Sequence, residues 1–128
     1  MSTKPILCLD FDGVIHSYTS GWKGATIITD PPVPGAMEFI AAAVEHFWVD
    51  VFSSRSSEPF GRDAMSRYIR DHLEKTVGPH KASIIISLIH FPTEKPPAFI
   101  SIDDRAITFQ GVWPEIATLL AFKPWNKQ

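Results

Sequence analysis

The chain has 128 residues, 45% of them hydrophobic and 20% charged, and its formal net charge is −2. This composition is typical of a globular protein, and it disfavours a disordered chain, a fibre and a tight non-specific binder of polyanions. With one cysteine, Cys8, no disulfide framework can form, and a reducing compartment is expected. The first residues lack the pattern of a signal peptide, and the longest apolar runs, such as residues 84–89, are too short to span a bilayer. We therefore expect one cytoplasmic domain, residues 1–128, without membrane association.

Strands and helices are predicted to alternate along the first half of the chain. Residues 6–9 are apolar on both faces, as in an inner strand of a parallel sheet. Residues 17–29 contain glycines and small polar residues, which predicts a loop. A helix should follow Pro34, with an inward stripe of Met37, Ile40, Val44 and Phe47. Residues 47–52 are a second expected strand, and it ends in a serine-rich segment.

The same alternation is predicted to continue to the C-terminus. A helix over about residues 59–76 should end at Gly78, and its inward residues are Met65, Tyr68, Ile69 and Leu73. Residues 83–91 and 99–102 are the third and fourth expected strands. A closing helix should begin near Pro114, with Ile116, Leu119 and Leu120 inward. These elements predict an α/β fold, a three-layer Rossmann-like sandwich with a mainly parallel sheet and no cap domain.

Paired carboxylates follow two of the expected strands. Asp10 and Asp12 follow the first strand, and Asp103 and Asp104 follow the fourth. Two carboxylates ~4 Å apart repel by about 4 kcal/mol at an effective dielectric near 20. In parallel sheets, ligands bind beyond the carboxyl ends of the strands. If the two strands are neighbours, the four acids converge on one pocket, which then requires a cation or a shared proton.

Oxygen ligands without a histidine or thiolate cluster favour Mg²⁺ over zinc. A magnesium site with few carboxylates completes its shell with substrate phosphate, which suits phosphoryl transfer, and a carboxylate can act as its nucleophile. Ser53, at the end of the second strand, could donate a hydrogen bond to a phosphoryl oxygen. Lys95 is the expected counter-charge, with Lys81 as its rival.

Four motifs in order resemble the haloacid dehalogenase (HAD) superfamily of phosphohydrolases, and the resemblance covers nearly the whole chain. The first is the apolar strand followed by the DxDG run that begins at Asp10. The second is a strand ending in Ser53, the third is Lys95, and the fourth is the strand that ends in Asp103 and Asp104. The first and fourth motifs are specific in combination, whereas the other two are weak alone.

The resemblance implies a single HAD-like hydrolase domain, residues 1–128, that hydrolyses a phosphomonoester with Mg²⁺. It implies that Asp10 is the nucleophile and that Asp12 is the general acid/base, with a pKa raised by burial and like charge. Magnesium would be bound by the Asp10 carboxylate, the Asp12 backbone carbonyl and Asp103, and supported by Asp104. Members without a cap often act on large substrates or use a neighbouring subunit, so a homo-oligomer remains open.

Other polar residues near these motifs have competing interpretations. Ser54 and Arg55 are predicted to bind substrate, and Arg55, Arg62 and Arg105 could supply a phosphate-binding rim. His16 and His90 fit loop histidines with satisfied hydrogen bonds better than catalytic groups. Trp22 fits a loop residue packed on the domain better than a stacking platform for a base or sugar. Asp10 and Asp12 could also be turn or cap residues, but the second acidic pair favours a functional site.

Two functions from other classes remain open. A phospho-acceptor signalling domain also combines paired acids, a hydroxyl residue and a lysine, although there the acidic pair ends the first strand and the phosphorylated Asp a later one. A catalytically silent scaffold module is the second alternative. The expected partner is a phosphorylated small molecule or a nucleic-acid end, and a polynucleotide end-phosphatase is the substrate variant that net acidity disfavours.

Overall fold

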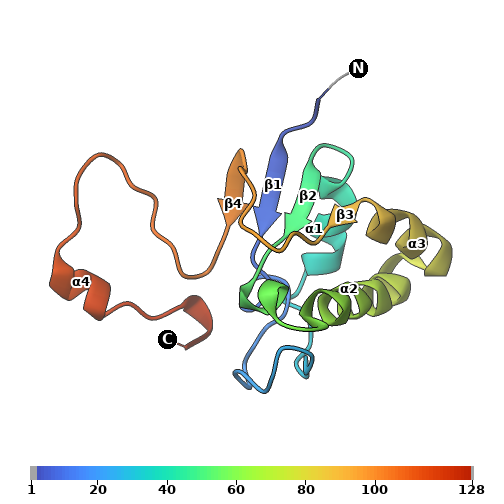
Figure 1. Cartoon of the computed structure of the whole chain (residues 1–128), viewed down its shortest axis with the longest axis horizontal. Helices are drawn as coiled ribbons and strands as arrows, with labels where there is room; N and C mark the ends of the chain where they lie inside the picture. The colour runs from blue at the N-terminus through green and yellow to red at the C-terminus, as the bar shows by residue number, and fades with distance from the viewer. Residues whose placement is uncertain (1–2, 128) are drawn as a thin grey trace.

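The computed structural model describes residues 3–127 and contains a four-stranded parallel sheet with the strand order β3-β2-β1-β4. The strands are β1 (Ile6–Leu9), β2 (Trp48–Val51), β3 (Ile89–His90) and β4 (Ile100–Ile102). The helices are α1 (Ala36–Ala43), α2 (Gly61–Val77), α3 (Pro79–Ser87) and α4 (Ile116–Leu120), with short 3₁₀ helices η1 (Ser54–Ser57) and η2 (Trp125–Lys127). The parallel, Rossmann-like α/β fold is confirmed (Figure 1).

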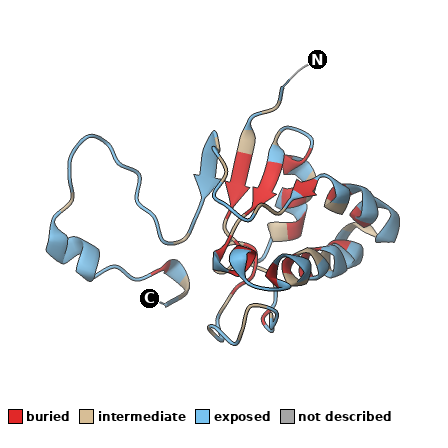
Figure 2. Cartoon of the chain, viewed as in Figure 1, coloured by how far each residue is buried: buried red, intermediate tan, exposed pale blue. Residues whose placement is uncertain are grey.

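One hydrophobic core joins β1 and β2 to the first three helices. Leu9 and Val51 are among the buried strand residues, and Figure 2 shows that burial concentrates in these two strands. The helix residues predicted to face inward in α2, namely Met65, Tyr68, Ile69 and Leu73, are all buried. Cys8, on the opposite face of β1 from Leu9, is also buried.

The third predicted strand is mostly a helix, so this prediction is wrong. α3 occupies Pro79–Ser87, and β3 has two residues. Pro79 stands in the first turn, where its fixed φ favours a helix. Ala82 and Ile85 lie one turn apart and are both buried, whereas Ile84 is 49% exposed. Packing against α2 therefore overrides the strand preference of the isoleucine run.

The C-terminal segment departs furthest from expectation. α4 forms beyond Pro114, but Ile116, Leu119 and Leu120 are exposed, so the prediction that they face inward is wrong. In Figure 1 the chain leaves β4 and makes a wide excursion through α4. It returns at η2, where Trp125 contacts Gly13. No helix among residues 3–127 is both long and apolar enough to cross a membrane.

Candidate active site

The ends of β1 and β4 lie side by side. The two strands pair in parallel with Leu9 opposite Ile102, and the Asp10 N–H donates to the Ile102 carbonyl at 3.0 Å. The acids that follow each strand therefore emerge at the same edge of the sheet. The predicted convergence of the two acidic pairs is confirmed for three of the four carboxylates.

Asp10, Asp103 and Asp104 form a three-acid cluster in which one carboxylate oxygen from each residue lies within 4.8 Å of the other two. The Asp104 side chain is only 3% exposed, and its Oδ1 is buried without a hydrogen-bond partner. Arg105 Nε lies 4.0 Å from the other oxygen, Oδ2, a long ion pair that leaves Oδ1 without a partner. A buried, unpaired carboxylate oxygen is costly, and a cation would satisfy it. The donor set of hard oxygens fits a divalent ion such as Mg²⁺ or Ca²⁺.

The electrostatics of Asp10 lead to the same conclusion. Burial raises the pKa of Asp10 to about 8, with further contributions from the hydrogen bond to Asp104 and from the charge of Asp103. The Phe11 N–H donates to Asp10 Oδ1 at 2.8 Å and opposes that rise in pKa. Without a cation, the cluster thus retains a proton near neutral pH. A bound divalent ion would favour the ionised carboxylate instead.

Asp12 points into a different environment from Asp10. Arg55 Nε lies 3.0 Å from Asp12 Oδ2, and Arg55 Nη2 donates to Oδ1 at 3.1 Å. The same Oδ1 lies 2.9 Å from His16 Nδ1. The Asp12 carboxylate therefore stands apart from the three-acid cluster. Its expected contact with a cation, through the backbone carbonyl, stays a prediction.

The hydrogen bonds of His16 define which ring nitrogen carries the proton. The Asp30 N–H donates to His16 Nε2 at 3.1 Å, so this nitrogen is the acceptor. Nδ1 must then carry the proton and donate to Asp12. The side chain is 1% exposed, as expected for a satisfied histidine. His90 is also paired, with its Nδ1 3.3 Å from Asp50 Oδ1, and lies on β3.

The pKa of Asp12 is lowered, contrary to expectation. Burial raises this pKa, but the hydrogen bonds from His16 and the Arg55 guanidinium outweigh burial. The prediction of a raised pKa is therefore wrong, because it considered burial and like charge but not two donors on one carboxylate. The lowered pKa keeps Asp12 ionised at neutral pH, the form that a general base requires, although it also weakens Asp12 as a proton acceptor.

Arg55 is buried and paired with Asp12, which does not match a place in a phosphate-binding rim. Its side chain is 0% exposed, and Nη1 donates to the carbonyls of Gly24 and Ala25 at 2.8 and 2.9 Å. The guanidinium carbon lies 4.8 Å from the centroid of the Trp22 ring. Arg55 thus connects the loop of residues 17–29 to Asp12. It is a positioning residue for that carboxylate.

A cavity of about 400 Å³ opens between the predicted motifs. Five predicted site residues line it: Asp10, Asp12, Ser53, Ser54 and Asp103. Ser53 caps η1, because its Oγ accepts from the Arg55 N–H at 3.1 Å and its N–H donates to Ser56 Oγ. The Ser53 hydroxyl hydrogen therefore remains free to donate to a ligand.

Two further residues line this cavity, and only Tyr18 was not predicted from the sequence. Tyr18 and Arg105 complete the wall of this cavity. Tyr18 has a φ of 60°, a strained value for a non-glycine residue. No pattern in the sequence signals that strain. Arg105 directly follows the second acidic pair, and its place in this wall is consistent with the phosphate-binding rim expected from the sequence.

Lys95 lines a neighbouring cavity of about 370 Å³ together with Asp10 and Asp103. Lys81 lies in the first turn of α3 and lines neither of these two cavities. Of the two lysines, Lys95 is therefore the one placed beside the acids. Its side chain is exposed, so it can move toward a bound anion.

Comparisons with family models, with curated proteins and with solved structures find no match for this chain.

Proposed function

We propose that the protein is a phosphatase of the HAD type that hydrolyses a phosphomonoester with the help of Mg²⁺. The observation that carries the proposal is the three-acid cluster at the paired ends of β1 and β4, in which Asp104 Oδ1 is buried without a hydrogen-bond partner. Asp10, Asp103 and Asp104 would hold the ion, which would neutralise charge on the phosphoryl oxygens. The four motifs of the resemblance converge there, since Ser53 and Lys95 lie on cavities that include Asp10 and Asp103.

Asp10 is the proposed nucleophile. Its carboxylate oxygen would attack phosphorus, the bond from phosphorus to the leaving oxygen would break, and an aspartyl-phosphate would form. Ser53 would donate its hydroxyl hydrogen to a phosphoryl oxygen, and Lys95 would balance the negative charge. Each of these groups lines one of the two cavities around Asp10.

Asp12 would act in the second step. Its lowered pKa keeps it ionised, so it can take a proton from the water that attacks phosphorus and releases Asp10. Arg55 and His16 hold the carboxylate in a fixed orientation. The role of general acid in the first step receives less support, because it requires a protonated carboxyl group. Substrates with acidic leaving groups, such as aryl phosphates, do not need that proton.

The test is hydrolysis of an aryl phosphate with Mg²⁺ by the wild type and by Asp10→Asn. The variant should lose about 10³-fold or more of the turnover, as expected when a nucleophile is removed. Asp50→Asn is the matched control, because Asp50 is a buried acid on β2 that pairs with His90. Near-wild-type turnover by Asp10→Asn would overturn the nucleophile assignment.

The same assay separates the alternatives. A phosphoryl group that persists on an aspartate would indicate a signalling domain. Inactivity of the wild type on phosphorylated metabolites, nucleotides and oligonucleotide ends would indicate a scaffold module.

A further inference from the structure

β4 is an incompletely covered strand. It stands at the edge of the sheet, and its three residues are all exposed. Ile100 is 51% exposed, Ile102 is 40% exposed, and the preceding Phe99 is 74% exposed. Strands of parallel sheets in α/β proteins are normally buried on both faces. Within the described residues, β4 therefore lacks the apolar layer that normally covers such a strand.

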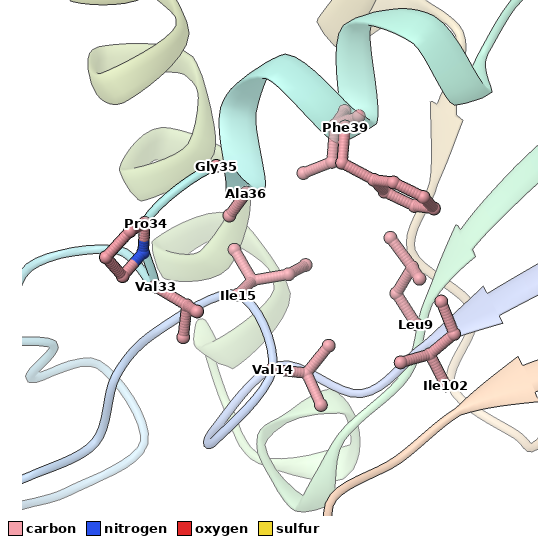
Figure 3. Close-up of a pocket in the computed structure, with 10 residues that line it drawn as sticks. Leu9, Val14, Ile15, Val33, Pro34, Gly35, Ala36, Phe39 and Ile102 are labelled. Carbon is pink, nitrogen blue, oxygen red and sulfur yellow. The ribbon is translucent and has the colours of Figure 1, made fainter.

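An apolar groove lies beside β4. It has a volume of about 210 Å³ and runs between the end of the sheet and the start of α1. Figure 3 shows Phe39 of α1 and Ile102 of β4 at one end of the groove, with Val33 and Pro34 at the other. None of its ten lining residues carries a charge. A partner that fills it must be apolar.

Residues 105–123, here called the apolar arm, have the matching chemistry. Eight large hydrophobic side chains on the arm are between 45% and 83% exposed, and Trp113 and Leu120 are the most exposed at 82% and 83%. In Figure 2 almost the whole arm is coloured as exposed. Long loops without their own packed core are uncommon unless they bind something.

The size and charge of the arm suit a stable interface. A standard interface takes about 800 Å² from each partner, and the eight large exposed hydrophobic side chains of the arm offer apolar surface for such a contact. The arm contains only three charged residues, Arg105, Glu115 and Lys123. Since the groove contains none, no like charges would oppose the contact.

Both ends of the arm are fixed to the body at one place. Asp104 lies against Gly13, and Trp125 Nε1 donates to the Gly13 carbonyl at 2.7 Å. From this base the arm projects away from α1 and leaves β4 uncovered (Figure 1). The arm also encloses a hollow of about 450 Å³, lined by Pro114, Leu119 and Phe122 among others, which could receive a projecting side chain.

We propose that the protein forms a two-fold symmetrical dimer in which the apolar arm of each copy covers β4 and the groove of the other. A two-fold interface uses the same surfaces twice, so each copy supplies one arm and one groove. This inference is independent of the proposed phosphatase activity.

Sedimentation velocity over about 1 to 100 μM protein tests the proposal. The wild type should sediment with twice the 14.3 kDa mass of one chain. Trp113→Ser with Leu120→Ser in the arm, or Phe39→Ser in the groove, should raise the dissociation constant more than tenfold. Ile84→Ser is the matched control, because Ile84 is 49% exposed on α3 and belongs to neither surface. Circular dichroism checks that every variant remains folded.

A mixing experiment tests the pairing itself. The arm variant retains its groove and the groove variant retains its arm, so one intact contact forms only between the two different chains. The mixture should therefore associate more tightly than either variant alone. A wild type that stays monomeric throughout the range, including one whose arm folds onto its own groove, would overturn the proposal. A dimer that forms as tightly in both variants as in the wild type would also overturn it. The same holds for a mixture that associates no more tightly than either variant alone.

Discussion

The indole of Trp125 donates to the carbonyl of Gly13, a residue 112 positions away in the sequence. The same glycine stands against the Asp104 carboxylate, which belongs to the three-acid cluster. Gly13 is thus the point where the DxDG turn, the second acidic pair and the returning C-terminal segment meet. A side chain at this position would disturb all three.

Gly13→Ala should reduce both stability and divalent-ion binding. Gly13 has a φ of +85°, and an added Cβ would collide with the Asp104 carboxylate. The backbone strain alone should cost about 1 to 2 kcal/mol in urea unfolding. Gly21→Ala is the control, because its φ is +78° but nothing lies within 4 Å of the added Cβ. Calorimetric titration with Mg²⁺ should show weaker binding for Gly13→Ala only. Equal binding by both variants would contradict the proposed role of Asp104.

Arg55→Met should destabilise the fold strongly. The substitution removes the guanidinium from a largely buried Asp12 and from the loop carbonyls of Gly24 and Ala25. Removing one partner of a buried ion pair costs about 3 to 5 kcal/mol. The loss is measured as the decrease in the free energy of unfolding in urea. Arg67→Met, on the exposed side of α2, should change it by no more than about 0.5 kcal/mol. A loss near 1 kcal/mol for Arg55→Met would mean that the pair contributes little.

In the metal-free protein, the contribution of Asp10 to the free energy of unfolding should fall as the pH rises. Because the folded pKa is raised to about 8, the native state binds more protons than the unfolded state above the ordinary aspartate range. The contribution of Asp10 to the free energy of unfolding is therefore fully present below about pH 4 and is lost as the pH rises through about 8.

The measurement is the difference in unfolding free energy between the wild type and Asp10→Asn from about pH 5 to 9. In the presence of a chelator, this difference should fall as the pH rises. Mg²⁺ should flatten the slope, because the ion favours the ionised carboxylate. A slope that is unchanged by Mg²⁺, Mn²⁺ and Ca²⁺ would argue against a cation at the cluster.

Trp125→Phe should cost about 0.5 to 1.5 kcal/mol of unfolding free energy, the usual contribution of one hydrogen bond. The indole is 53% exposed, so little apolar burial is lost. Amide hydrogen exchange around Gly13 should accelerate, because the returning segment is released. Trp22→Phe is the control, since it keeps an aromatic ring over Arg55 and leaves the hydrogen bond between Trp125 and Gly13 in place. Unchanged exchange in Trp125→Phe would show that the segment is held by other contacts.

The sequence predicts the inner strands and α2 well because their patterns are local. Leu9 and Val51 lie in short apolar runs, and the buried stripe of α2 has helical spacing. The convergence of Asp10 with Asp103 follows from the rule that parallel strands end at one edge. α3 was mispredicted because its isoleucine run favours a strand, whereas Pro79 and contact with α2 favour a helix.

The environment of Asp12 could not be predicted from the spacing of residues. Arg55 lies 43 positions from Asp12, and only the fold brings the two together. Burial was anticipated, but the number of donors on the carboxylate was not. α4 presents a different difficulty. Its apolar pattern predicts burial, but the pattern does not indicate the surface against which the helix packs.

The position of Cys8 in an inner strand of the sheet has a practical use. Its thiol is buried on β1, and burial, followed by the nearby charge of Asp50, raises its pKa, so little thiolate exists at neutral pH. Thiol reagents should modify the chain mainly when the sheet opens, because Cys8 is only 6% exposed in the folded state. Since no other cysteine competes, the labelling rate of the natural protein should report how often the centre of the molecule unfolds.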